Sequence, residues 1–374
     1  MEELRGMNER VRKLRKQSVE TTPHIFMERA IYMTQAYKKY EGSVSIPELR
    51  ALSMKEIFEN KTITIEDGEL IVGDKGAGPQ STPTFPELCC HTIEDMHVMN
   101  DRDLICFKVS DEDLKIQEEE IIPFWEKRSI RKKIIESMTD EWRRCYEAGV
   151  FTEFMEQRGP GHTVGSEKLY VKGFLDYQKD IQDAIAKLDY LNDEKAMSKR
   201  EQLNAMSIMC DAIMILGKRY AALAREMAEK ETDPVRKEEL LQIAHNCDVV
   251  PAHKPETFWQ AIQMYWFVHL GVTTELNPWD AYSPGRLDQH LNPFYVHDHD
   301  KALELLECLW VKFNNQPAPP KVGITLKESS TYTDFANINT GGITPDGKDG
   351  VNEVSYLILD CMDEMKLLQP SSNV

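Results

Sequence analysis

The sequence has 374 residues, of which 41% are hydrophobic and 29% are charged, a composition typical of a globular protein with a sizeable core. Its formal net charge of -18 argues against nucleic acid and anionic membranes as partners. The eight cysteines form no Cys-x-x-Cys pair and the sequence opens on a charged segment without a signal peptide, so we expect reduced thiols, no bound metal and a cytoplasmic location.

The first 250 residues are predicted to be mainly helical. Asp233 followed by Pro234 has the pattern of an N-cap and a first helical position, so a helix is expected to start there. Before it, apolar residues spaced three and four apart predict one face of a long helix. These residues are Met209, Ile213, Leu216, Tyr220, Leu223 and Met227.

The most apolar part of the chain, residues 258–270, is predicted to be a buried helix. Residues 257–274 contain no Asp, Glu, Lys or Arg. A membrane span needs about 20 predominantly apolar residues. The polar side chains of Gln260, Gln263 and His269 therefore favour a helix inside a soluble core.

Short extended segments are predicted at residues 62–65, 70–72 and 322–326, and turns at 74–83 and 341–350. No internal repeat or low-complexity linker divides the sequence. Helices interspersed with a few short strands predict an α/β fold.

The end of the sequence is unusual. An amphipathic helix is predicted from a last set of apolar positions, which are Val354, Leu357, Ile358, Cys361, Met362 and Met365. Pro370 is expected to end this helix, and residues 371–374 look like the approach to a strand that does not follow. A frayed terminus is one interpretation, and a truncated chain is the other.

Residues 279–295 are the most informative segment, because they place aromatic, charged and turn-forming residues directly after the buried helix. Such a segment can be held rigidly and still face a cavity. Asp280 is the candidate for ligand contact, since a buried carboxylate needs a cation or hydroxyl partner. An ion pair between Asp280 and Arg286 is an equally good interpretation. Arg286 and Asp288 are interpreted as structural residues.

A second candidate is His162, which follows Gly-Pro-Gly at residues 159–161. Glycine allows a tight backbone path, and a histidine on such a loop has the pKa range for proton transfer. A hydrogen-bonding surface histidine is the commoner outcome for a lone loop residue.

Two other clusters are interpreted as structural. Residues 297–300 alternate His and Asp, as metal ligands could, but a solvated helix start with acidic groups is the preferred interpretation. Adjacent Cys89 and Cys90 cannot easily chelate one metal and are expected to be buried thiols.

Short segments spread along the sequence share one family resemblance. They are residues 12–15, 23–25, 28–30, 68–73, 159–162, 279–295, 339–342, 346–347, 352–353 and 355–356. Together they resemble the glycyl radical enzymes, the pyruvate formate-lyase-like family, over essentially all 374 residues. Residues 85–92, 151–157 and 327–335 are most similar to the branch of this family that dehydrates trans-4-hydroxy-L-proline.

The resemblance implies a ten-stranded α/β barrel wrapped by helices, with a radical glycine loop and a cysteine loop at its centre. In the family, a glycyl radical installed by a radical S-adenosylmethionine activating enzyme converts the cysteine to a thiyl radical. The thiyl takes a hydrogen from the substrate, the neighbouring hydroxyl leaves as water, and return of the hydrogen from the cysteine gives 1-pyrroline-5-carboxylate. Such a lyase needs a dry site and is expected to act in an anaerobic cytoplasm, as a homodimer when full length.

The resemblance also implies which residues line the substrate pocket. His162 is expected to hold the substrate and move protons near the leaving hydroxyl. Asp280 is expected to bind the ring amine and Ser329 the carboxylate. Phe154 and Phe335 are expected to pack against the ring.

The sequence departs from the family pattern in two places. No cysteine has the Gly-Cys-Val-Glu-like flanks of the thiyl cysteine, and no Gly-Tyr pair marks a radical glycine. We therefore expect residues 1–374 to be the N-terminal, largely helical half of the barrel, inactive alone and prone to associate through exposed apolar surface. The alternatives are another member of the family, such as a glycerol or propanediol dehydratase or a formate acetyltransferase-like enzyme, and a non-catalytic remnant that acts only as a binding protein.

Overall fold

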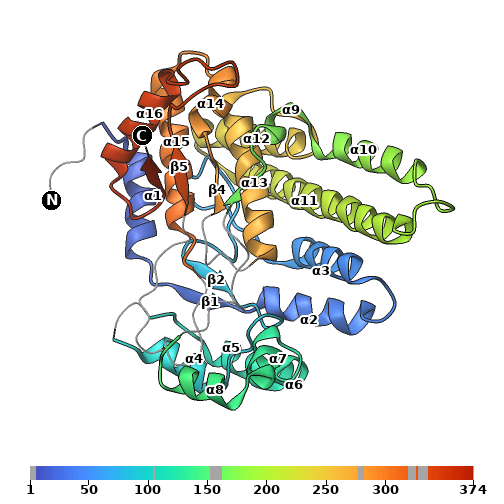
Figure 1. Cartoon of the computed structure of the whole chain (residues 1–374). Helices are drawn as coiled ribbons and strands as arrows, with labels where there is room; N and C mark the ends of the chain where they lie inside the picture. The colour runs from blue at the N-terminus through green and yellow to red at the C-terminus, as the bar shows by residue number, and fades with distance from the viewer. Residues whose placement is uncertain are drawn as a thin grey trace.

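The computed structural model describes residues 6–103, 106–151, 162–276, 282–318, 326 and 336–373, with only the backbone of His162. Helices predominate in these residues, and short strands run through the centre of the molecule (Figure 1).

The helices are grouped here by their place in the chain. The first group contains α1 (Glu9–Glu20), α2 (Glu28–Tyr40), α3 (Ile46–Asn60), α4 (Ile93–Asp101), α5 (Asp111–Ile116), the π-helix η1 (Gln117–Ile121), α6 (Ile122–Trp125), α7 (Ile130–Ser137) and α8 (Asp140–Glu147). The second group contains α9 (Lys168–Val171), α10 (Phe174–Ala186), α11 (Ala196–Lys230), α12 (Pro234–Val249), α13 (Phe258–Glu275), α14 (Leu287–Leu291), the 3-10 helix η2 (Asn292–Phe294), α15 (His299–Asn314) and α16 (Glu353–Met365).

The described strands form parallel pairs. They are β1 (His24–Phe26) with β2 (Ser81–Pro83), β3 (His162–Thr163) with β4 (Tyr282–Ser283), and β5 (Asn337–Asn339) with β6 (Ser371–Asn373). An isolated bridge between Gly285 and Ile338 joins β4 to β5. Parallel neighbours need a crossover connection, and helices supply one between the members of each pair. The predicted α/β class is therefore confirmed.

Helix α13 lies between two hydrophobic clusters. It begins after Thr257, whose side chain accepts a hydrogen bond from the Gln260 backbone N–H. Trp266 packs into the cluster that includes α1, α15 and α16, whereas Phe267 packs into the cluster of α2, α3, α11 and α12. The predicted buried helix is confirmed. None of the helices in the described ranges is long and apolar enough to span a bilayer.

The long helix α11 and the start of α12 also follow the sequence pattern. The predicted apolar face of α11 packs into the cluster that it shares with α3 and α12, and α10 and α11 together project from the body (Figure 1). At Gly217, α11 approaches the chain beyond α12 so closely that an added Cβ would lie 2.7 Å from Pro251 Cδ. Pro234 is the first residue of α12, and the Asp233 side chain accepts from the Val235 N–H.

Two of the predicted strands are wrong, because residues 62–65 and 70–72 form no strand. A side chain of α13 takes the place of a neighbouring strand at Val72. Gln263 accepts from the Val72 N–H and donates to the Val72 carbonyl, both at 2.9 Å. The indoles of two α13 tryptophans donate to carbonyls on either side of this residue. The third predicted strand, at 322–326, lies outside the described residues except for Leu326.

The structure also corrects the turn predicted at 74–83 and the end of the chain. Residues 75–80 form bends and turns as predicted, but the last three residues of the predicted turn form β2. Helix α16 forms as predicted but ends at Met365, before Pro370, with Lys366 in the left-handed conformation at φ 44°. The residues after Pro370 form β6 on β5, so the strand that was expected not to follow is present. Its partner lies far upstream in the sequence, which is why local pattern did not show it.

Candidate functional site

Most of the sequence-predicted pocket lies outside the described residues. Phe154, Asp280, Ser329 and Phe335 are outside them, and only the backbone of His162 is described. The side-chain roles of these residues therefore stay predictions. Their described neighbours along the chain do have defined positions.

The described neighbours of His162, Asp280 and Phe335 lie at the same edge of the parallel strands β3, β4 and β5. His162 is the first residue of β3 and pairs with Tyr282, the first residue of β4. An isolated bridge sets β5 beside β4. Asp280 precedes β4 in the sequence, and Phe335 precedes β5. Because the strands are parallel, the chain enters all three of them from the same edge.

The spacing of β3, β4 and β5 is fixed by contacts near this edge. The Ser283 hydroxyl of β4 accepts a hydrogen bond from the Asn337 N–H of β5 at 2.9 Å. Gly285 has a φ of 71°, and a Cβ there would lie 2.8 Å from Thr163 Cγ2. Only glycine combines that backbone conformation with so close an approach. The strands are thus held together by side-chain fit as well as by backbone pairing.

The second half of the 279–295 segment is structural. Asp288 is fully buried, and its carboxylate accepts from the Gly341 N–H at 2.7 Å and from the Ser355 hydroxyl. Arg286 donates from Nη1 to the Ile343 carbonyl at 2.7 Å. These contacts tie α14 to the 341–350 turn and to α16. The structural interpretation of Arg286 and Asp288 is confirmed.

The His-Asp alternation at 297–300 is the start of α15, as predicted. The Asp298 side chain caps this helix by accepting from the Lys301 N–H at 3.2 Å. His297 Nδ1 lies 2.8 Å from a carboxylate oxygen of Glu353. Within the described part of the chain, no three His, Cys, Asp or Glu side chains are grouped to hold a metal ion.

Several of the cysteines are buried, Cys89 among them, whereas Cys90, which was also expected to be buried, is half-buried. Burial, with the nearby carboxylates of Glu126 and Asp95, raises the pKa of Cys90 to about 12. Burial also raises the pKa of Cys308 to about 12. The reactive form of a cysteine is the thiolate, so these environments favour structural thiols.

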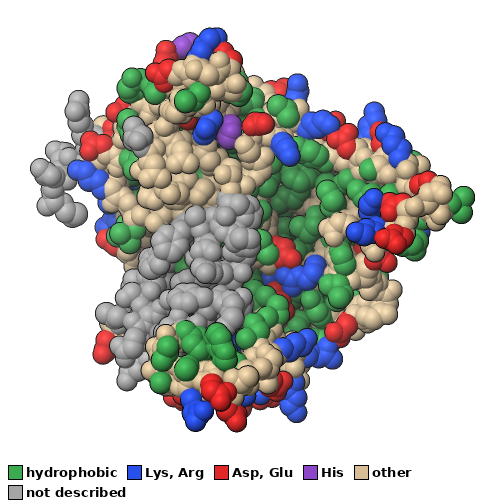
Figure 2. Space-filling model, in the orientation of Figure 1, with side chains coloured by type: hydrophobic (Ala, Val, Ile, Leu, Met, Phe, Trp, Pro, Cys, Tyr) green, Lys and Arg blue, Asp and Glu red, His purple; other side chains and the backbone are tan. Residues whose placement is uncertain are grey.

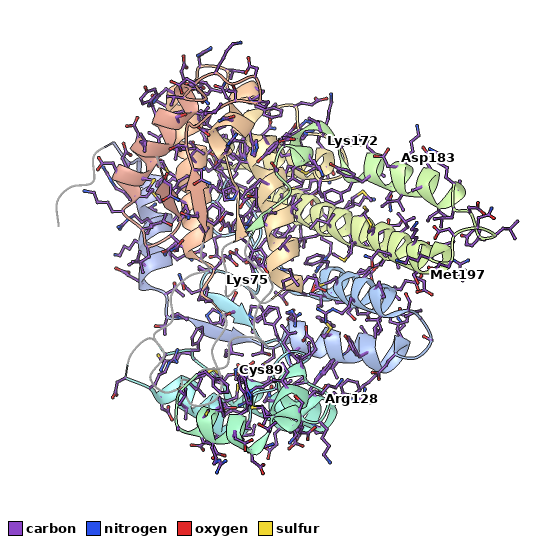
Figure 3. All side chains as sticks on the ribbon, in the orientation of Figure 1. Lys75, Cys89, Arg128, Lys172, Asp183 and Met197 are labelled. Atoms are coloured by element: carbon purple, nitrogen blue, oxygen red, sulfur yellow. The ribbon has the colours of Figure 1, made fainter. Side chains whose placement is uncertain are left out.

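A buried charge cluster, which sequence reasoning missed, joins α15 to the chain that follows α3. Lys312 donates to Asp74 Oδ2 at 2.8 Å and to the Glu69 carboxylate, and all three side chains are at most 3% exposed. Lys61 donates to the Asp74 carbonyl at 2.5 Å. Burial raises the pKa of Glu69 to about 7 although Lys312 opposes the shift. Figure 3 shows the neighbouring Lys75 at the centre of the molecule.

The only sequence signal for this cluster is a lone lysine in the apolar stretch 308–313. A buried lysine requires an anionic partner. The partners, however, lie more than 200 residues upstream, at separations of 243 and 238 residues. No local pattern could identify them.

Comparison with known proteins supplies the family. The pyruvate formate lyase-like family model matches residues 7–374. The chain therefore belongs to this family of glycyl radical enzymes, as the sequence resemblance predicted.

Particular members of this family are similar to the chain over nearly its whole length. The chain is 68% identical over 377 residues to trans-4-hydroxy-L-proline dehydratase of Clostridioides difficile, covering 99% of this chain and 48% of that protein. The crystal structure of hydroxyproline dehydratase from Clostridioides difficile with trans-4-hydroxy-L-proline bound superposes with a TM-score of 0.95 at 68% identity, covering 100% of this chain and 48% of that one.

A more distant solved structure shares the same architecture. The glycerol-bound B12-independent glycerol dehydratase from Clostridium butyricum gives a TM-score of 0.90 at 31% identity, covering 99% of this chain and 48% of that one. The chain spans about half the length of the relatives that it matches.

Proposed function

We propose that this chain is the N-terminal half of a glycyl radical dehydratase that removes water from trans-4-hydroxy-L-proline to give 1-pyrroline-5-carboxylate. The 68% identity to trans-4-hydroxy-L-proline dehydratase over 99% of the chain carries the proposal. The common strand edge beside three of the predicted pocket positions supports it.

Each proposed role follows from the chemistry of the substrate. Hydroxyproline carries a cationic ring amine, which the Asp280 carboxylate would bind through a charge-assisted hydrogen bond. The Ser329 hydroxyl would donate to the substrate carboxylate. His162 would supply the proton that the leaving hydroxyl needs. Phe154 and Phe335 would pack against the apolar ring and exclude water.

In this proposal the remaining chemistry comes from polypeptide outside residues 1–374. That polypeptide would contribute the thiyl cysteine, the radical glycine and the other half of a ten-stranded barrel. A radical S-adenosylmethionine enzyme would install the radical. The complete enzyme would act as a homodimer in an anaerobic cytoplasm, and residues 1–374 alone would not turn over substrate.

The test is anaerobic expression of the complete reading frame with an activating enzyme, followed by measurement of hydroxyproline loss. We expect hydroxyproline to be consumed and glycerol and 1,2-propanediol to be left unchanged. Turnover of a diol without loss of hydroxyproline would favour a diol dehydratase. A reading frame that closes at Val374 would favour a non-catalytic binding protein.

A pair of matched variants tests the pocket assignment. Asp280→Asn should lower kcat/KM by about 10- to 150-fold, the usual range for a lost hydrogen bond to a charged group. Asp300→Asn removes a carboxylate that is fully exposed at the start of α15 and should leave kcat/KM unchanged. Equal kcat/KM in both variants would remove Asp280 from the pocket.

A further inference from the structure

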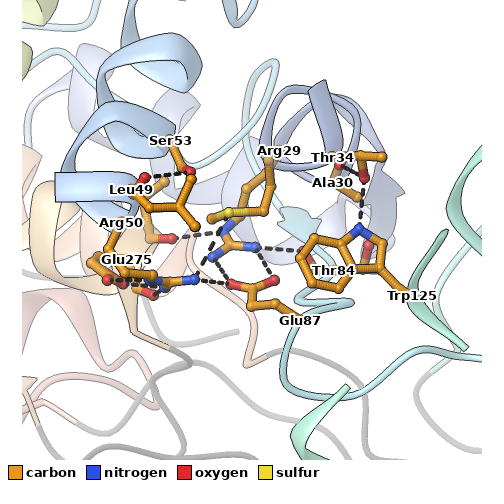
Figure 4. A network of polar contacts seen from close by, with 12 residues as sticks. Arg29, Ala30, Thr34, Leu49, Arg50, Ser53, Thr84, Glu87, Trp125 and Glu275 are labelled. Carbon is orange, nitrogen blue, oxygen red and sulfur yellow. Dashed lines mark hydrogen bonds and ion pairs between the residues drawn. The ribbon is translucent and has the colours of Figure 1, made fainter. Parts of the chain in front are cut away.

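Two arginines from other helices hold the last turn of α13 (Figure 4). Arg29 of α2 donates from Nε to the Thr274 carbonyl at 2.7 Å. Arg50 of α3 donates from Nε and Nη2 to the two carboxylate oxygens of Glu275 at 2.9 and 2.7 Å. Its Nη2 also lies 3.2 Å from the Glu275 carbonyl oxygen. The last carbonyls of a helix have no partner within the helix, and here the arginines supply one.

Buried Glu87 joins the two arginines into one network. Arg29 Nη2 and Nη1 donate to its two carboxylate oxygens at 2.6 and 3.2 Å. Arg50 Nη1 donates to Glu87 Oε1 at 3.2 Å. Burial alone would raise the pKa of Glu87, but the two arginines outweigh burial and hold it at about 2. Glu87 therefore keeps its negative charge across the whole pH range in which enzymes normally work.

Stability alone is a weak reason for such a network, because well-packed hydrophobic residues often stabilise a core as well as buried ion pairs do. Directional hydrogen bonds also fix the positions of the groups that they join. The planar fork of Arg50 fixes the carboxylate of Glu275 in two directions, and Arg29 fixes the carbonyl one residue earlier. The end of α13 is thereby tied to α2, to α3 and to the chain after β2.

We infer that Arg29 and Arg50 are positioning residues that set where the chain leaves α13 toward Asp280. This inference rests on the proposed function, in which Asp280 binds the substrate. Two residues after Asp280 in the sequence, Tyr282 of β4 pairs with β3. Displacement of a binding group by about 1 Å can cost 100-fold in activity, so a loosened α13 end should weaken substrate binding.

Arg50 and Glu275 are the residues to change, because Arg29 is 1% exposed and its loss would endanger the fold. Their side chains are 23% and 24% exposed. Both border an apolar hollow of about 800 Å³ between α3, α9, α10 and α11, which Figure 2 shows in surface view. Arg128→Met is the matched control, since Arg128 forms an exposed pair with Glu41 at the periphery of the molecule (Figure 3).

The first measurement is the KM for hydroxyproline of the activated complete enzyme. KM does not depend on how much of the enzyme is folded, so a purely structural defect lowers the apparent kcat and leaves KM unchanged. We expect Arg50→Met and Glu275→Gln to raise KM at least 10-fold, Arg50→Lys to raise it less, and Arg128→Met to leave it unchanged. An unchanged KM in Arg50→Met would overturn the inference.

The second measurement is hydrogen–deuterium exchange, which does not need activity. The Leu276 N–H is protected by a hydrogen bond to the Val272 carbonyl at 2.8 Å. We expect at least 10-fold faster exchange there in Arg50→Met but not in Arg128→Met. Unchanged exchange would refute positioning whatever the enzyme turns over. Faster exchange in Arg50→Met would support positioning of the α13 end even if the activated wild-type enzyme leaves hydroxyproline unchanged. That second result would refute the proposed function alone.

Discussion

Replacing Lys312 with methionine is predicted to be among the most destabilising changes in the chain. Methionine fills similar space in α15 but leaves the carboxylates of Glu69 and Asp74 without the cation that both now contact. Breaking a buried ion pair from one side costs about 3–5 kcal/mol. Urea unfolding at pH 7 should therefore show a loss of about that size in the free energy of unfolding.

The cost of this substitution should also grow with pH. A carboxyl whose folded pKa lies above its unfolded value contributes stability at low pH, and that stability is lost as pH rises through the folded pKa. In the wild type this loss ends near the Glu69 pKa of about 7. Without Lys312 the folded pKa rises further, so the loss continues at about 1.4 kcal/mol per pH unit. The destabilisation should be about 2 kcal/mol larger at pH 8.5 than at pH 7.

Two control variants separate charge from packing. Lys301→Met removes a partly exposed lysine of the same helix, which pairs with Glu304, and should cost less than about 1 kcal/mol. Adding Glu69→Gln and Asp74→Asn to Lys312→Met should recover part of the loss, because no uncompensated charge then remains buried. A cost below about 1 kcal/mol for Lys312→Met, or one that shrinks as pH rises, would refute the reasoning.

Three further predictions follow from burial and close packing. Burial lowers the pKa of His269 to about 3. The free energy of unfolding of the wild type should therefore fall by about 2 kcal/mol more than that of His269→Phe between pH 7 and pH 5. Equal pH dependence of the two proteins in urea unfolding would contradict this. Gly173→Ala would place a Cβ 2.2 Å from the Ala252 carbonyl oxygen and should cost about 1–3 kcal/mol; unchanged stability would show that the backbone can move. Exposed Cys145 should react with a thiol reagent in the folded protein. Cys361 is buried, and burial raises its pKa, so it should react only after unfolding. Equal reaction rates of the two cysteines would contradict the described burial.

The elements that sequence predicted well are those fixed by neighbouring residues. Asp233 and Pro234 predicted the start of α12, and in the structure they are its N-cap and its first residue. The stretch 257–274, which has no charged residue, predicted helix α13. In both cases the signal and the structure lie within one or two helical turns.

The predictions that failed depended on residues far apart in the sequence. Residues 70–72 have a strand-like composition, but Gln263 binds the backbone of Val72 from 191 positions away. The strand β6 needed a partner that local pattern could not supply. Where a short segment has no clear periodicity, only its tertiary contacts decide whether it becomes a strand.

The candidate site shows the same division. His162 and Asp280 were candidates from their local sequence, whereas family resemblance assigned their roles and added Ser329. The network around Glu87 had no sequence signature, and the cluster around Lys312 showed only its lone lysine, because each joins charges from segments distant in the chain. Sequence reasoning thus nominated pocket residues but not the buried charges that hold the elements leading to them.

The proposed function is tested most directly by one measurement on the complete, anaerobically activated enzyme. Hydroxyproline and 1,2-propanediol are offered in the same reaction, and the loss of each is followed. We predict loss of hydroxyproline with formation of 1-pyrroline-5-carboxylate and no loss of the diol. Loss of the diol with hydroxyproline unchanged, in enzyme that carries the radical, would contradict the proposal.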